Sequence, residues 1–391
     1  MITFFWISIA LIFYTFFGYG FLLFLLVKLR RIFKGKRKTP VVLNNWPTLT
    51  VVIAAYNEEG LIEAKINNTL ALQYPKDKIE YVFVTDGSTD ETPAIISRYP
   101  LIKLLHTDKR SGKIAAIHRA MEVVNSEIVI FTDANTFLNS NALTNICRHY
   151  DDPKVGAVAG EKRVHVDERA DATAGEGFYW KYESKLKTWD SELYSVVGAA
   201  GELFSVRRKL YKPVEADTVL DDFMISMLIA EKGYRIVYEP EAYATENGSE
   251  SIVEELKRKI RIAAGGIQSI IRLKTLLNPF HHPLLSFQYI SHRVLRWTIT
   301  PFLMILALIL NVLIATRHGN ILYEILLTLQ AIFYSCSVVG WMLEKKEVRI
   351  KLLFIPYYFC MMNYAVAAGI RRYILGKQSA AWEKAKRKQA A

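Results

Sequence analysis

The stretch FTDANT, residues 131–136, places two oxygen-bearing side chains, Asp133 and Asn135, directly after an apolar run. In an extended backbone these side chains point the same way, because side-chain direction alternates along a strand. Two such oxygen donors suit a hard divalent cation held beside a phosphate. The alternative is an ordinary turn at the end of a strand, where Asp and Asn are common. The choice depends on which other side chains the fold brings to the same place.

Asp86 and Lys113 are two further side chains that could take part in such a site. Asp86 ends the apolar run IEYVFVTD, and Lys113 opens a helical pattern after the next apolar run. An ordinary turn, with Ser88 or Thr89 as a helix cap, is the alternative for Asp86, and a solvated helix face is the alternative for Lys113. A lysine near a helix N-terminus can also meet a phosphate. Aspartates at two strand ends, with a lysine nearby, favour one binding site over separate turns.

The elements that must position these residues alternate between strand and helix. Predominantly apolar runs typical of strands occur at 48–55, 79–86, 101–106 and 127–133, and the first of them carries no charge, which suits a strand buried on both faces. Helical patterns separate them, which predicts an α/β fold with a doubly wound, mostly parallel sheet. Ligands bind beyond the carboxyl ends of the strands in such sheets. The polar side chains named above are expected at that edge.

The motifs VVIAAYNEEG, VTDGSTDET, KRSGKIAAIHRA and FTDANT, in this order, resemble those of family 2 glycosyltransferases with the GT-A fold. That family includes the cellulose, hyaluronan and poly-N-acetylglucosamine synthases. The resemblance implies that Asp86 lies near the base of a nucleotide and that Asp133 binds Mg²⁺ or Mn²⁺ at its diphosphate. Asn135 stands where the family has a second metal-site aspartate. The resemblance also implies that the nucleotide is seated by Ala55, Tyr56, Asn57 and Glu58.

A second group of residues is expected on the acceptor side. Small residues at 198–201 indicate either a close approach of ligand or tight helix packing, and the resemblance places Gly201 and Glu202 near the acceptor. Sugar transfer from a nucleotide diphosphate needs one base to take the acceptor proton. The resemblance to the family's Thr-Glu-Asp motif implies that Asp222 is this base, with Asp221 beside it. A helix cap is the alternative for both aspartates.

A basic run at 257–261 follows in the sequence EELKRKIRIAAGG. Arg258 and Arg261 are expected to clamp the diphosphate, for which arginine is well suited. A basic helix that faces solvent or lipid is the alternative. The run lies where processive synthases carry a Gln-x-x-Arg-Trp motif. Ile262 stands in place of the Trp, which weakens the case for a processive polymerase.

Apolar segments bracket this domain. Residues 2–27 carry no charged side chain and are long enough to span a bilayer, and the basic residues that follow predict a cytoplasmic domain. Three C-terminal spans would place the basic tail outside, against the positive-inside rule, so the run 350–370 is left open as re-entrant or interfacial. The expected segments are an anchor (1–30), a GT-A domain (48–270), an interfacial amphipathic helix (275–296), transmembrane helices (297–370) and a basic tail (371–391).

The formal net charge of +12 lies largely beside the apolar runs, which favours membrane lipid headgroups over nucleic acid as partners. No zinc-finger spacing or RNA-binding aromatic signature is present in the sequence, and its three cysteines lack metal-ligand spacing. We therefore expect no nucleic-acid partner.

The predicted protein is an inverting transferase of the plasma membrane, the bacterial inner membrane, with its catalytic domain in the cytoplasm. It would move a sugar from a nucleotide sugar, with UDP expected, to a lipid-linked or glycan acceptor in surface polysaccharide synthesis. The alternatives are a processive synthase that couples polymerisation to export and a non-catalytic membrane scaffold that binds nucleotide or glycan. The sequence leaves the oligomeric state open.

Overall fold

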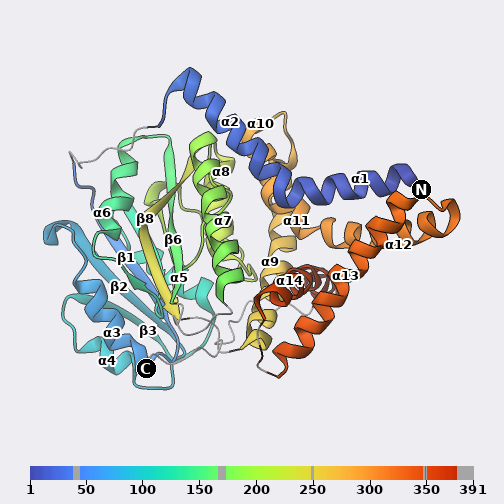
Figure 1. Ribbon diagram of the computed structural model, residues 1–391. Coiled ribbons are helices and arrows are strands. Elements are labelled where there is room, and N and C mark those ends of the chain that lie inside the picture. Colours follow the sequence, from blue (N-terminus) through green and yellow to red (C-terminus); the bar gives the residue numbers. More distant parts are fainter. Residues whose placement is uncertain (38–44, 166–172, 248–250, 347, 349, 377–391) are drawn as a thin grey trace.

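The computed structural model describes residues 1–37, 45–165, 173–247, 251–346, 348 and 350–376. An α/β domain is built on one sheet, and long helices extend from one side of it (Figure 1). Within the described residues the sheet has the strand order β3-β2-β1-β4-β7-β6-β8-β5. The strands are β1 (Leu49–Ala55), β2 (Ile79–Asp86), β3 (Ile102–Thr107), β4 (Ile128–Asp133), β5 (Phe137–Leu138), β6 (Val155–His165), β7 (Leu203–Arg207) and β8 (Arg235–Asn247).

The first half of the sheet is parallel, as predicted. Strand β1 pairs in parallel with β2 and β4, and β3 pairs in parallel with β2. In this register Ala54 lies opposite Asp133, and Ala55 lies opposite Thr85, the residue before Asp86. The carboxyl ends of these strands therefore meet at one edge. Strand β7 runs antiparallel to both β4 and β6, so the second half of the sheet is mixed.

Helices cover both faces of the sheet and form two separate cores. Neighbouring residues of one strand face opposite sides: Val51 enters one core and Val52 enters the other. The first core includes α3 (Glu59–Leu70), α4 (Thr92–Ser97) and α6 (Ala142–Cys147). The second includes α5 (Lys113–Val123), α8 (Asp221–Glu231) and part of α9 (Ile252–Arg272). Strands buried on both faces explain why the sequence shows continuous apolar runs.

In the part of the chain that the structure describes, four helical segments are long and apolar enough to cross a membrane. The first runs from Ile2 to Lys34 and comprises α1 (Ile2–Phe13), a π-helical turn (Tyr14–Gly18) and α2 (Tyr19–Lys34). The others are α12 (Thr300–His318), α13 (Ile321–Glu344) and α14 (Lys351–Ile374). Figure 1 shows α1, α12 and α13 on the side of the molecule away from the sheet.

Helix α14 is continuous through Pro356 and packs against α9 of the α/β domain. Its Gly369 lies so close to α9 that an added Cβ would come within 2.5 Å of the Cβ of Ala263 and 2.8 Å of the nitrogen of Ala264. The last apolar helix therefore lies directly against the α/β domain.

The segment expected as one interfacial helix, 275–296, is broken in the structure. A 3₁₀ turn (Lys274–Leu277) ends before Pro279, and α10 (Pro283–Tyr289) starts at a second proline. Proline lacks the amide proton that a helix interior requires, so the break falls between these turns. A π-helical turn (Ile290–Val294) and α11 (Leu295–Trp297) then continue α10.

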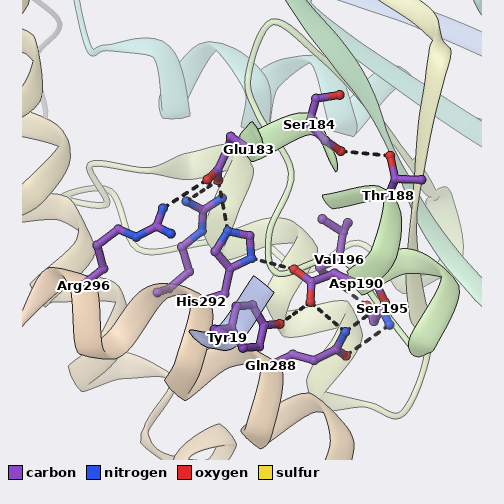
Figure 2. Close-up of polar contacts among 11 residues, drawn as sticks. Tyr19, Glu183, Ser184, Thr188, Asp190, Ser195, Val196, Gln288, His292 and Arg296 are labelled. Atoms are coloured by element: carbon purple, nitrogen blue, oxygen red, sulfur yellow. Dashed lines mark hydrogen bonds and ion pairs between the residues drawn. The ribbon is translucent and has the colours of Figure 1, made fainter. Parts of the chain in front are cut away.

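A buried charged network joins this broken segment to α7 (Thr173–Leu193) of the α/β domain (Figure 2). The imidazole of His292 lies between two α7 carboxylates, 2.6 Å from Asp190 and 3.2 Å from Glu183. Arg296 contacts Glu183 at 3.1 Å, and Tyr19 of the first apolar helix donates its hydroxyl to Asp190. Segments far apart in sequence therefore meet at one dry cluster, which we call the α7 junction.

Candidate active site

The loops that follow β1 and β2 are bound to each other. Asn57 has a positive φ of 53°, which directs its side-chain oxygen to the amide of Thr89 at 2.8 Å. Its own amide donates to Ser88 at 3.2 Å, and the amide of Glu58 donates to Thr92 at 2.8 Å. Asparagine is among the few residues that accept this backbone conformation readily. The expected nucleotide residues thus form one rigid double loop at the carboxyl edge of the sheet.

A shallow hollow, open to solvent, lies beside this double loop. Asp86 is buried in its wall, where it accepts the amides of Ser111 and Gly112 at 2.7 and 2.5 Å and pairs with Arg119 at 2.9 Å. The guanidinium of Arg110 stacks over the ring of Tyr56, 3.9 Å from its centroid. A flat aromatic wall beside a hydrogen-bonding carboxylate suits a nucleotide base. The hollow is lined by Ala54, Ala55, Tyr56, Asp86, Arg110, Gly112, Lys113 and Ala116.

Lys113 lies among three carboxylates at the far end of this hollow. Its Nζ is 2.9 Å from Oδ1 of Asp133 and 3.5 Å from Oδ2 of Asp221. Burial alone would lower the pKa of Lys113, but the carboxylates of Asp133, Asp221 and Asp222 together hold it above its ordinary value. The structure therefore brings three predicted motifs together, although 109 positions separate Lys113 from Asp222 in the chain.

Asp222 has the protonation behaviour of a general base at neutral pH. Burial and, after it, the adjacent charge of Asp221 raise the pKa of Asp222 to about 7, and Lys113 opposes the rise. Burial likewise raises the pKa of Asp133, against the effect of Lys113. The helix-cap alternative does not apply, because the cap residue of α8 is Leu220. A base works best when its pKa lies near the working pH.

The donor set fits a hard divalent cation. Among the described residues no group of three or more His, Cys, Asp or Glu side chains could hold a metal alone. However, Oδ2 of Asp221 is buried and makes no hydrogen bond in the described part of the chain, and Asp133 lies on the other side of Lys113. Carboxylate oxygens of this kind suit Mg²⁺ or Mn²⁺ when phosphate and water complete the coordination. Asn135 lies on the same turn and is half-buried.

The expected acceptor-side residues divide into two groups. An added Cβ on Gly201 would lie 3.3 Å from both Oδ2 of Asp222 and Nζ of Lys113, so this glycine leaves the carboxylates accessible. Gly198 instead packs on the ring of Phe223, where a Cβ would come within 2.1 Å. Glu202 pairs with Lys162 at 2.5 Å, and this charge outweighs burial and holds the pKa of Glu202 well below its usual range.

Helix α9 presents one face to the segment before Asp221. Gln268 accepts the amide of Val219 at 2.9 Å, and an added Cβ on Gly265 would lie 2.8 Å from the side chain of Leu220. Arg261 is four positions before Gly265 and so lies on the same face. Arg258 is one turn earlier again. Its guanidinium pairs with Glu255 at 3.3 Å and Glu246 at 3.6 Å, so any diphosphate would compete with these carboxylates.

The site contains residues that sequence reasoning missed. Arg119 pairs with Asp86 from the end of the motif KRSGKIAAIHRA, in which the helix start singles out only Lys113. Lys162 pairs with Glu202 from β6, and no local pattern marks it. Lys65 was detectable in principle, because it lies on the apolar stripe of α3 between Ile62 and Ile66, where a solvated lysine does not belong.

Comparisons with known proteins agree with this geometry. Residues 50–214 match the family described as Glycosyl transferase family 2. The chain is 25% identical over 247 residues to the poly-beta-1,6-N-acetyl-D-glucosamine synthase of Staphylococcus aureus strain MSSA476, which covers 60% of this chain and 58% of the synthase. It is 30% identical over 166 residues to the beta-monoglucosyldiacylglycerol synthase of Nostoc sp. strain PCC 7120, covering 40% of this chain and 34% of that enzyme. The chain thus spans little more than half the length of the synthase and a third of that of the Nostoc enzyme.

Among solved structures, the chain resembles the mannosyltransferase PcManGT from Pyrobaculum calidifontis, solved in complex with GDP-Man and Mn²⁺. The TM-score is 0.72 at 25% sequence identity, and the match covers 96% of this chain and 99% of that protein. The similarity therefore includes the long apolar helices as well as the α/β domain. The predicted GT-A fold is confirmed.

Proposed function

We propose that this chain, whose residues 50–214 are a glycosyl transferase family 2 domain, moves a sugar from a nucleotide sugar to an acceptor at a membrane. The observation that carries the proposal is the Asp222 carboxyl, with a pKa of about 7, beside the Lys113–Asp133 pair at the edge of the hollow lined by Tyr56 and Asp86. One base, one cation and a hollow for the donor are the parts that such a transfer needs.

The reaction is a single displacement. The acceptor hydroxyl oxygen forms a bond to the anomeric carbon, while the bond from that carbon to the diphosphate oxygen breaks. Asp222 takes the hydroxyl proton, and the diphosphate leaves with the bonding electron pair, so the configuration inverts. Lys113 stabilises the charge that grows on the diphosphate. Asp86 and Tyr56 hold the nucleotide base.

Mg²⁺ or Mn²⁺ would be held by Asp133, with Asp221 and Asn135 nearby, and would neutralise charge on the diphosphate. The Mn²⁺ bound in the similar mannosyltransferase supports the assignment of a divalent cation to this site. In this chain, Asp133 is the first candidate for a metal ligand. UDP is the donor nucleotide expected from the sequence, and the GDP-Man in that structure makes GDP the second nucleotide to be tested.

The acceptor is proposed to be lipid-linked or a growing glycan, presented by the bilayer. The long apolar helices and the name of the Nostoc relative, a glycolipid synthase, support a membrane acceptor. The basic residues that end α2 support a cytoplasmic α/β domain, because positive charge is retained on that side. A processive synthase is the second candidate, favoured by the similarity to the staphylococcal polymerising enzyme.

The test is nucleotide release by the purified protein in lipid nanodiscs. A panel of UDP-, GDP- and dTDP-sugars with Mn²⁺ and native lipid extract is compared with the Asp222→Asn variant. Release from one donor, lost in the variant, supports the transferase and names half of its reaction. Product length then separates single transfer from polymerisation. No release from any donor would favour a binding scaffold over an enzyme.

A further inference from the structure

Lys65 is a fully buried amine that the proposed reaction does not use. It lies on the core-facing side of α3, and its side chain has no exposed surface. Its Nζ donates to Oγ1 of Thr132 at 3.1 Å and to the carbonyl oxygen of Thr136 at 2.7 Å. Taking an ammonium out of water is costly, and a well-packed apolar side chain often stabilises a core better. The presence of lysine here therefore calls for a reason other than stability.

The two contacts of Lys65 bracket the turn that carries the expected metal ligands. Thr132 precedes Asp133 and Thr136 follows Asn135. The hydroxyl of Thr136 closes this turn by donating to the carbonyl oxygen of Asp133 at 3.0 Å. One amine thus holds both ends of the turn from beneath, on the side away from the donor hollow.

The direction of the hydrogen bonds extends this hold to the acceptor side. Oγ1 of Thr132 accepts from Nζ of Lys65, so this hydroxyl gives its single proton elsewhere. The carbonyl oxygen of Glu202, 2.9 Å away, accepts that proton and is nearer than Oγ1 of Thr136 at 3.0 Å. Glu202 directly follows Gly201, the glycine that lies against the proposed base and Lys113. A chain of two hydrogen bonds therefore links Lys65 to the wall beside that base.

We propose that Lys65 is a positioning residue that sets the spacing between the metal-binding turn at Asp133 and the base Asp222, an inference that rests on the proposed transferase function. It acts through Thr132, whose hydroxyl it orients towards Glu202. Loss of the amine frees the turn and lets the hydroxyl of Thr132 rotate. Metal affinity and the distance between donor and base then change together. Supporting groups of this kind typically change metal affinity by about 10- to 100-fold.

The experiment measures Mn²⁺ binding directly, by the electron paramagnetic resonance signal of free Mn²⁺, in nanodiscs containing UDP or GDP. Lys65→Met keeps the length of the side chain and removes both hydrogen bonds. Asn68→Ala is the matched control, because Asn68 is on the same helix and binds the backbone of Leu138 instead of the turn. We expect about tenfold weaker Mn²⁺ binding in Lys65→Met at a temperature where both variants are folded, and unchanged binding in Asn68→Ala.

Two further variants cover the case in which Lys65→Met does not fold. Thr132→Val removes the hydroxyl that links Lys65 to Glu202, and Thr132→Ser retains it. Weaker Mn²⁺ binding in the valine variant alone supports the proposal. Wild-type binding in a folded Lys65→Met or Thr132→Val protein overturns it and leaves Lys65 a structural residue. If the wild-type protein itself binds no Mn²⁺ with either nucleotide, the metal-dependent transferase is what fails.

Discussion

The ammonium of Lys113 lies 2.9 Å from a carboxylate oxygen of Asp133, and the two residues come from the ends of different β–α units. The pair places a fixed positive charge next to the residue expected to bind metal. The ammonium of Lys113 also lies 3.5 Å from Oδ2 of Asp221. One side chain therefore balances negative charge both beside the expected metal ligand and beside the proposed base.

Replacing Lys113 by methionine should therefore slow transfer, and it should also lower the unfolding temperature, because Asp133 and Asp221 lose their cation. We expect kcat/KM for the nucleotide sugar to fall by about 10²- to 10³-fold, because a preorganised charge at the leaving diphosphate is lost. Steady-state nucleotide release measures this. Lys109→Met, at a lysine in the preceding loop, is the control. Equal values of kcat/KM in Lys113→Met and Lys109→Met would mean that Lys113 pairs with Asp133 but does not assist transfer.

Asp222→Asn should separate activity from stability. We expect nucleotide release to fall by about 10²- to 10⁴-fold, because the acceptor proton has no base. The same variant should unfold at a higher temperature than wild type at pH 8. The pKa of Asp222 is about 7 in the folded protein against an ordinary value of 3.8, so its ionisation costs folding free energy.

The pH dependence of that stability difference follows from the same pKa. Between about pH 4 and pH 7 the unfolded chain loses the Asp222 proton while the folded protein keeps it, so wild-type stability falls with rising pH. The amide that replaces this carboxyl in the variant has no proton to lose. Thermal unfolding across this range should show the advantage of the variant widening up to about pH 7 and then levelling. A constant difference would indicate that Asp222 is not the titrating group.

The rate of transfer should rise with pH through an apparent pKa near 7. Below this value Asp222 is protonated and cannot accept the hydroxyl proton, since its raised pKa keeps the acid form populated. The ratio kcat/KM, measured from pH 5 to pH 9, tests this. A flat profile would place the base elsewhere or make another step rate-limiting.

The α7 junction predicts a large effect from a residue far from the donor hollow. His292→Leu should lower the thermal unfolding temperature strongly, because it leaves the buried Asp190 and Glu183 without their shared partner. Loss of a buried hydrogen-bond partner costs about 1–3 kcal/mol, and here Glu183 keeps Arg296 and Asp190 keeps Tyr19. His281→Ala, an exposed histidine in the same segment, should change little. An unchanged unfolding temperature in His292→Leu would show that the network contributes no net stability.

Packing of α14 on α9 can be tested with a single methyl group. Gly369→Ala should destabilise the protein by about 1–3 kcal/mol, because the new Cβ meets backbone atoms of α9 that cannot move aside. Gly60→Ala is the matched control: a helical glycine with no atom within 4 Å of the added Cβ. We expect that variant to gain slightly in unfolding temperature. A lower unfolding temperature in both Gly369→Ala and Gly60→Ala would point to a general effect of replacing glycine by alanine.

Much of the candidate site could be predicted because it depends on strand ends. Asp86 and Asp133 each close an apolar run, and a parallel register necessarily brings such ends to one edge. Lys113 could be predicted because it lies at the start of the helix that follows β3, at the same edge of the sheet. These relationships are local in sequence and repeat from one β–α unit to the next.

The roles of the remaining residues depend on contacts between distant parts of the chain, even where a local pattern singles out the residue. Lys65 lies on an apolar stripe, and its charge favours the surface unless partners such as Thr132 and Thr136 are known. Arg258 is expected at the diphosphate from sequence, yet a strand and its own helix provide carboxylates for it. The mixed half of the sheet is equally non-local, because β7 inserts between β4 and β6 from a later part of the chain.

The α7 junction also constrains the order in which the chain can finish folding during synthesis. Tyr19, which donates its hydroxyl to Asp190, is synthesised long before Asp190. His292, another partner of Asp190, is synthesised 102 residues later. Until that segment leaves the ribosome, Asp190 and Glu183 lack the basic partners that the segment supplies, although α7 can already pack on the first apolar helix through Leu23, Val27 and Leu186. Completion of the α7 junction is therefore a late event, coupled to the arrival of the segment that leads into the next apolar helix.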